Sequence, residues 1–171
     1  MSQPIDSFAE LAASYCTLIE RHGDYTAQEF IARVREVLPQ LYYYALRLPD
    51  METTDQELDH NINHDEWSAT CCSLRRKFGI NDHYWEIYEP LKLEHDDPVA
   101  GSLSDDLADI WRDLRPGVTR WSDSSDTMQK QIIWEWRFSF HQHWSNHAVD
   151  ALRVINWITK CYGVRDAQND A

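Results

Sequence analysis

The sequence predicts an all-α, single-domain bundle of about five helices around a long C-terminal helix. Apolar residues recur at three- and four-residue spacing in several segments, and capping and stop signals separate those segments. A chain of 171 residues, 43% hydrophobic and 26% charged, has the size and composition of one soluble globular domain. Residues 1–171 are therefore treated as a single α-helical domain.

The N-terminal half contains three predicted helices. The first covers residues 5–21 and stops at a His-Gly pair, and the second begins with a capping box formed by Thr26 and Glu29. Pro39 lies inside the second helix, where we expect a kink. The third covers residues 64–78 and stops at a glycine.

Three segments are predicted to lie outside helices. Residues 49–63 lack periodicity and carry no Lys or Arg, which indicates an exposed acidic loop. Residues 80–101 contain two prolines and an aromatic cluster, so we expect irregular structure with at most a short extended piece at 84–88. The tail 163–171 is predicted to be flexible.

The next helix begins at Gly101-Ser102, with Asp105 three residues after the serine, and is predicted to end at Pro116-Gly117. The last helix is predicted over residues 127–161 and carries two apolar stripes, which is typical of a helix surrounded by others. Its 35 residues would span ~52 Å, longer than the ~40 Å diameter of a compact domain of this size. We therefore expect it to bend, break or project, most readily at Ser145-Asn146.

Charge and composition restrict the function classes. The formal net charge is -13, and residues 50–113 contain 17 Asp and Glu against five Lys and Arg. A surface of this sign repels nucleic acid and anionic membranes and attracts basic proteins or divalent cations. No transmembrane run or secretion signal is recognisable, and the cysteine spacing indicates reduced thiols, so we expect a cytoplasmic protein.

The sequence carries no recognised catalytic motif. A nucleophile elbow, a P-loop and a dinucleotide-binding fingerprint are all lacking, and the five glycines are isolated. The leading interpretation is a binding or regulatory domain whose acidic face engages a basic protein partner, rather than an enzyme.

The stretch "EWRFSFHQHWSNHAVDAL" supplies the alternative, a metal-dependent enzyme. His143 and His147 lie four residues apart on one side of the last helix, whereas His141 points elsewhere and the H-E-x-x-H zinc motif is absent. Further ligands would come from the 102–115 helix. The expected metal set, for a divalent ion such as zinc or iron, is His143, His147, Asp106, Asp109 and Asp113.

Two metal-free interpretations use the same region. His147 lies near the centre of the apolar arc, where it could join a buried polar network with Asp106 and with Arg137 paired to an aspartate of the 102–115 helix. The other is an acid/base pocket without a metal. The leading interpretation, a binding or regulatory domain, requires no cofactor. For the histidine region, the sequence leaves open the metal site, the buried polar network and the metal-free acid/base pocket.

Four strings carry a family resemblance: "LRLPD", "YWEIYEP", "GSLSDDLADIWRDLRPG" and "WEWRFSFHQHWSNHAVDALR". Together they resemble the bacterial family catalogued as domain of unknown function 5063, over about residues 8–157. The resemblance implies a compact bacterial domain and assigns it no activity.

Overall fold

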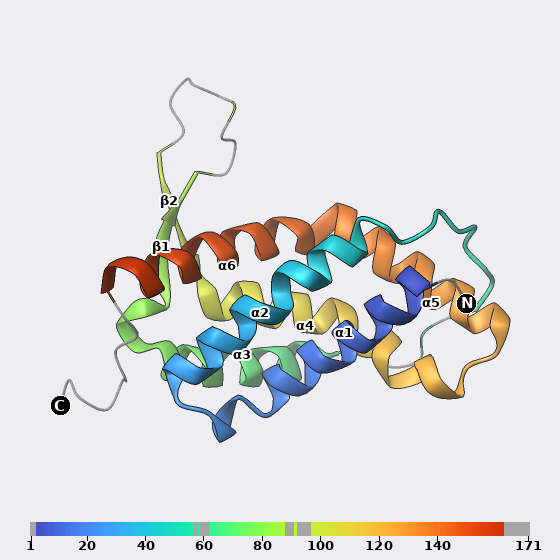
Figure 1. The fold of residues 1–171 in the computed structure, drawn as a ribbon, viewed down its shortest axis with the longest axis horizontal. Coiled ribbons are helices and arrows are strands. Elements are labelled where there is room, and N and C mark those ends of the chain that lie inside the picture. Colours follow the sequence, from blue (N-terminus) through green and yellow to red (C-terminus); the bar gives the residue numbers. More distant parts are fainter. Residues whose placement is uncertain (1–2, 57, 59–61, 88–90, 92–96, 163–171) are drawn as a thin grey trace.

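The computed structural model describes residues 3–56, 58, 62–87, 91 and 97–162. It is predominantly helical, as predicted, with a small two-stranded sheet (Figure 1). The tail 163–171 and part of the acidic loop, residues 57 and 59–61, lie outside the described residues. In chain order the elements are α1 (Gln3–Glu20), α2 (Ala27–Ala45), α3 (His64–Phe78), β1 (His83–Glu86), β2 (Val99–Ser102), α4 (Leu103–Arg120), α5 (Asp126–Ser139) and α6 (Ser145–Trp157).

Helix starts follow the predicted capping signals. Thr26 and Glu29 form a complete capping box at α2, and Ser102 accepts a hydrogen bond from the Asp105 amide at α4. Gly79, with φ 55°, ends α3 in a conformation that favours glycine. Pro39 lies inside α2, which runs on to Ala45.

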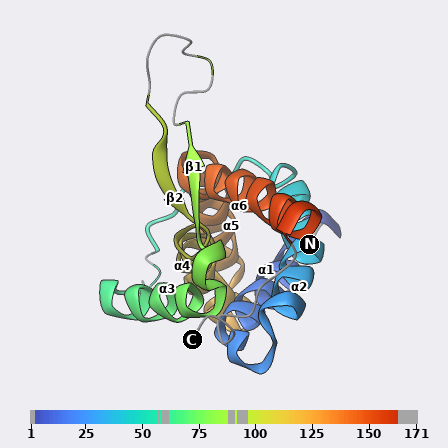
Figure 2. The same cartoon turned by 90° about the vertical axis from the view of Figure 1, so that its left-hand side faces the viewer.

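Helix α4 is the element with the most neighbours. It packs against α1, α3, α5 and α6, and Figure 2 shows it between α3 on one side and the α1/α2 pair on the other. One hydrophobic core cluster joins the apolar faces of all six α-helices. None of the described helices is long and apolar enough to cross a membrane.

The predicted end of the fourth helix at Pro116-Gly117 is wrong, because α4 continues to Arg120. A Cβ on Gly117 would lie 2.5 Å from Nε1 of Trp136, whose indole also donates a hydrogen bond to the Leu114 carbonyl at 3.2 Å. The glycine therefore permits close packing of α4 on α5 instead of ending the helix.

Gly117→Ala is expected to cost about 1–3 kcal/mol of unfolding free energy, since the new methyl group collides with the buried Trp136 ring. Chemical denaturation would measure it. Gly23→Ala is the matched control, because nothing lies within 4 Å of its added Cβ, and it should change stability by less than about 0.5 kcal/mol. Equal effects at the two positions would contradict the packing role.

The predicted C-terminal helix is a continuous helical run with an irregularity inside it. α5 and α6 are joined by the π-helical segment Phe140–Trp144, and a second π segment, Ile158–Tyr162, follows α6. The irregularity ends immediately before the predicted weak point at Ser145-Asn146.

The predicted enclosure of this run on all sides is wrong. One stripe, including Trp136, Trp144 and Ala148, is buried, but Phe138 and Val149 on the other stripe are about half exposed. The run therefore covers one side of α4, and α4 takes the central place.

The segment predicted to be irregular contains a hairpin. β1 pairs with β2 in antiparallel register, with Tyr84 opposite Gly101 and Trp85 opposite Ala100. A Cβ on Gly101 would lie 2.5 Å from the Tyr84 ring, so the glycine leaves room for that side chain. The hairpin projects from the body beside α6 (Figures 1 and 2).

Candidate metal centre

Three aspartates of α4 face two histidines of the C-terminal run. Asp106, Asp109 and Asp113 are spaced three and four residues apart, which places them on one face of α4. His143 belongs to the π-helical segment, and His147 lies in the first turn of α6. Because α4 packs against α6, the five predicted ligand candidates come together.

Each imidazole has one nitrogen held by a carboxylate. Nδ1 of His147 lies 2.9 Å from Oδ1 of Asp106, and Nδ1 of His143 lies 2.8 Å from Oδ2 of Asp113. Both are good hydrogen-bond distances. A carboxylate on Nδ1 fixes the orientation and tautomer of a neutral imidazole and leaves Nε2 free to bind a metal.

The other nitrogens both face Asp109. Nε2 of His147 lies 3.4 Å, and Nε2 of His143 3.9 Å, from the same atom, Oδ2 of Asp109. These separations are long for a hydrogen bond but resemble those between ligands sharing one metal ion. Asp109, His143 and His147 form the candidate ligand triad; Asp106 and Asp113 are its supporting carboxylates.

The size of the triad can be compared with metal geometry. One ligand atom from each residue lies within 4.8 Å of the other two. Ligand bonds of about 2.0–2.2 Å at the tetrahedral angle place two ligand atoms of one zinc ion about 3.3–3.6 Å apart. The two Nε2–Oδ2 distances, 3.4 and 3.9 Å, are close to this value. Metal binding requires the longest separation in the triad to shorten by up to about 1–1.5 Å, through rotation of the partly exposed imidazoles.

Burial and charge distinguish the members of the cluster. Burial raises the pKa of Asp106 to about 6, against hydrogen bonds from His147 and Tyr84 that act to lower it. Burial also lowers the pKa of His147, but the hydrogen bond to Asp106 and the charges of Asp106 and Asp109 outweigh it, so the net shift is upward. Without a metal, His147 is therefore readily protonated between two carboxylates.

Two contacts were not predicted from the sequence. The Tyr84 hydroxyl, from β1, donates a hydrogen bond to Oδ2 of Asp106 at 2.7 Å. Arg112 lies 2.8 Å from Oδ1 of Asp109, which leaves Oδ2 of that carboxylate facing the histidines. Arg112 follows Asp109 by three residues on a helix, a recognisable spacing, whereas Tyr84 reaches the site only through the hairpin.

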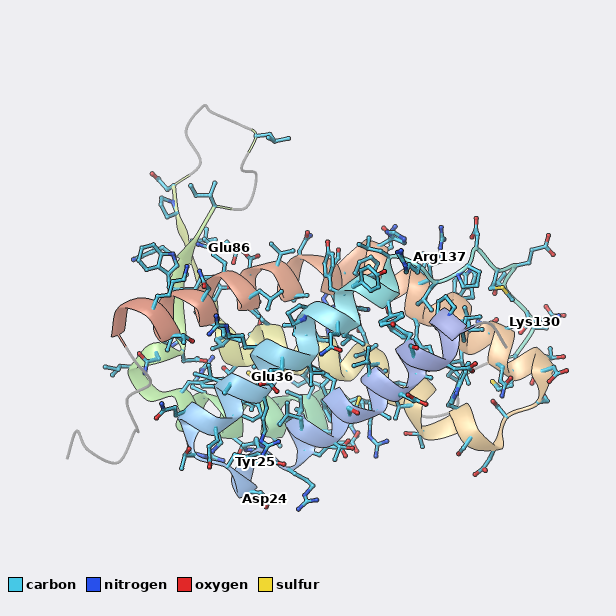
Figure 3. All side chains as sticks on the ribbon, viewed as in Figure 1. Asp24, Tyr25, Glu36, Glu86, Lys130 and Arg137 are labelled. Atoms are coloured by element: carbon cyan, nitrogen blue, oxygen red, sulfur yellow. The ribbon has the colours of Figure 1, made fainter. Side chains whose placement is uncertain are left out.

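The predicted pairing of Arg137 with the 102–115 helix is wrong. Its Nη1 lies 3.1 Å from Oδ1 of Asp50, an exposed residue after α2, and Figure 3 shows Arg137 on the outer surface of the run. Of the predicted polar network, the His147–Asp106 pair forms without Arg137. His141 is exposed and contacts the Phe140 ring, apart from the other two histidines as predicted.

Comparison with known proteins supplies a family. The family model described as "Domain of unknown function (DUF5063)" matches residues 1–160. The chain belongs to this family. Among solved structures it is similar to protein BF1032 from Bacteroides fragilis, with 19% identity, a TM-score of 0.81, and coverage of 96% of this chain and 97% of that one. No curated protein matches. The likeness to BF1032 shows a shared fold, and the family description assigns no activity.

In this DUF5063 protein, Tyr84→Phe tests whether the hydrogen bond from Tyr84 of β1 to Asp106 supports the candidate metal site. Removal of the hydroxyl leaves the buried Asp106 with one fewer hydrogen bond and lets the carboxylate that orients His147 move. We expect Zn²⁺ affinity to fall by about tenfold, the lower end of outer-shell effects, with the fold retained. Calorimetric titration would measure it; unchanged affinity would remove Tyr84 from the site.

Stability of the metal-free DUF5063 protein should decrease as pH rises. The pKa of His147 is raised above its usual 6.5 on folding, so its stabilising contribution is present below that value and is lost as pH rises through the folded-state pKa. The pKa of Asp106 is also raised on folding, so its contribution to stability is likewise lost as pH rises, in this case between about pH 4 and pH 6. Denaturation of chelator-treated protein at pH 6 and pH 8 would show a larger loss for the wild type than for His147→Gln. Equal losses would contradict the assignment.

Proposed function

We propose that this DUF5063 protein binds one divalent transition-metal ion through Asp109, His143 and His147 and uses it as a Lewis acid on a bound water molecule. The observation that carries the proposal is the pairing of the imidazole nitrogens. Both Nδ1 atoms are held by carboxylates at hydrogen-bond distance, while both Nε2 atoms face one oxygen of Asp109.

The donor set favours zinc or ferrous iron. Two imidazoles and one carboxylate are the ligands of many catalytic zinc sites and of the iron-binding facial triad. Hard cations such as Ca²⁺ and Mg²⁺ prefer sites made of oxygen alone. Three protein ligands leave positions for water, and a metal-bound water is acidic enough to supply hydroxide near neutral pH.

Access to the site supports a catalytic rather than a purely structural ion. The side chain of His143 is 37% exposed, whereas structural zinc sites are closed by four protein ligands. A polar cavity of about 750 Å³ begins at Asp113 and Arg112 and extends along Gln131 and Glu135. The three proposed ligands do not line this cavity, so it would bring a small polar substrate to the supporting carboxylate Asp113, which pairs with His143.

The π-helical segment is a second supporting feature. The Ser145 amide bonds back to the Phe140 carbonyl, five residues earlier, and this widened turn contains His143. π segments are rare in proteins and are frequently found at functional sites. In this chain the segment contains a candidate ligand, His143.

The competing function of the same residues is a metal-free polar network in which protonated His147 links Asp106 and Asp109. A direct test uses protein purified without a histidine tag and treated with a chelator. We expect one Zn²⁺ per chain in calorimetric titration, and Co²⁺ should give absorption bands of a low-symmetry site with nitrogen and oxygen ligands. Weak binding without a defined stoichiometry would favour the network.

A basic protein partner is a second proposed role, supported by a separate surface. Asp82, Asp106 and Asp109 are buried, so they contribute no exposed charge, but Asp50 and Asp65 with their neighbours Glu52, Asp55 and Glu66 are exposed before and at the start of α3. Affinity capture from a native bacterial lysate at low and high salt tests this role. We expect a partner that is lost at high salt, and capture of no salt-sensitive partner would count against it.

A further inference from the structure

A surface groove lined in part by Tyr84 differs from the rest of the surface in the side chains that form it. It has a volume of about 370 Å³ and lies between the base of the hairpin and the C-terminal end of α6. Tyr84, Trp85 and Trp157 supply aromatic surface, and Trp85 and Trp157 are 71% and 57% exposed. Tryptophan is enriched at interaction surfaces, and grouped exposed apolar side chains are typical of binding sites.

The charge of the groove is the second observation. None of the residues that line it is Asp or Glu, although the chain contains 29 of them. Glu86, labelled in Figure 3, belongs to the same strand but does not line the groove. Asp82 immediately precedes β1. It is fully buried, and its carboxylate accepts a hydrogen bond from the Ser104 amide at the start of α4. The lining of the groove is therefore free of acidic side chains, and Asp150, which pairs with Arg153, lies beside it.

The polar groups of the groove are hydrogen-bond donors. Nδ2 of Asn81 is buried and has no hydrogen-bond partner among the described residues, although a buried amide donor normally has one. The Arg153 guanidinium lies at 3.4 Å from Oδ1 of Asp150 and 3.4–3.5 Å from the Trp85 carbonyl, distances longer than those of strong charged hydrogen bonds. The Arg153 guanidinium therefore retains capacity for an acceptor on a ligand, whereas the Asn81 amide nitrogen is closed off from the groove.

From these observations we propose that the groove binds a small aromatic monocarboxylate, with its ring against Trp85 and Trp157 and its carboxylate on Arg153. The volume is within the range of small-ligand sites and too small for a folded partner. The open, aromatic walls suit a flat ring, which stacks on indole faces. The arginine supplies charge complementarity that the surrounding acidic surface lacks.

The test is calorimetric titration of the full chain with 2-naphthylacetate, and with 2-naphthaleneethanol as the neutral ligand of matched shape. Chelator-treated protein is used, so that a carboxylate cannot bind through a metal ion and the result is independent of the proposed metal centre. We expect saturable binding of the acid at sub-millimolar to millimolar concentration, and affinity for the alcohol lower by about tenfold or more.

Two variants locate the site. Arg153→Gln and Trp157→Ala are each expected to raise the Kd of 2-naphthylacetate about tenfold, because one removes the charged donor and the other a wall of the groove. Arg137→Gln is the matched control, since Arg137 is a partly exposed arginine of the same helical run that pairs with an aspartate outside the groove. It should leave the Kd unchanged.

Several results would overturn the proposal. These are equal affinity for the acid and the alcohol, unchanged binding by Arg153→Gln, or no saturable binding up to about 10 mM. The same holds if light scattering shows a dimer of this chain that Trp157→Ala converts to monomer, since the groove would then receive a second copy. Thermal unfolding of each folded variant confirms that lost binding is local.

Discussion

His147→Ala is expected to lower Zn²⁺ affinity by more than about 100-fold. Removal of an outer-shell partner typically costs 10–100-fold, and loss of a ligand exceeds that. His147 has the shorter of the two Nε2 distances to Asp109, at 3.4 Å, and the more buried ring of the pair. Its loss also leaves the buried Asp106 without an imidazole partner. Calorimetric titration of the chelator-treated variant, against the wild type, gives the change in affinity.

His141→Ala is the control for this experiment. His141 is exposed, lies two residues before His143, and is not among the grouped ligand candidates. Its variant should bind Zn²⁺ with wild-type affinity, while His143→Ala should resemble His147→Ala. Similar affinity in all three variants would show that zinc binds elsewhere on this acidic chain.

Helical periodicity was sufficient to predict the members of the cluster. Asp106, Asp109 and Asp113 share a face because their spacing is three and four residues, and His143 and His147 do so for the same reason. The roles within the cluster were not predictable. Whether a histidine turns Nδ1 or Nε2 toward a given carboxylate depends on the distance and rotation between two packed helices. It also depends on the π segment, because a wider turn alters the angular position of His143 around the helix axis.

Contacts between distant segments account for the other differences. Tyr84 reaches Asp106 because β1 pairs with β2, and no local pattern in residues 83–86 indicates that Tyr84 contacts a residue twenty-two positions later. Arg137 pairs with Asp50 because the segment after α2 passes beside α5, which helical spacing alone cannot show. The pair Pro116-Gly117 is a common helix-stop signal, but α4 continues through it. Gly117 instead leaves room for the Trp136 ring.

Trp144→Ala is expected to lower the unfolding free energy by about 3–5 kcal/mol, the usual cost of truncating a large buried aromatic residue. Trp144 is 0% exposed, and its ring packs edge-on against Phe140 with centroids 4.7 Å apart. Its Nε1 has no hydrogen-bond partner among the described residues, so the loss comes from burial and the cavity alone. Trp157→Ala, at a position 57% exposed, should cost less than about 1 kcal/mol.

The same substitution connects the core to the candidate site. Trp144 follows His143 in the π-helical segment, and the buried indole and Phe140 hold that segment against the core. If this packing fixes the direction of His143, Trp144→Ala should weaken Zn²⁺ binding under conditions where it remains folded, whereas Trp157→Ala should not. A stability loss below about 1 kcal/mol would show instead that the run is peripheral and that the histidines are positioned by their aspartates alone.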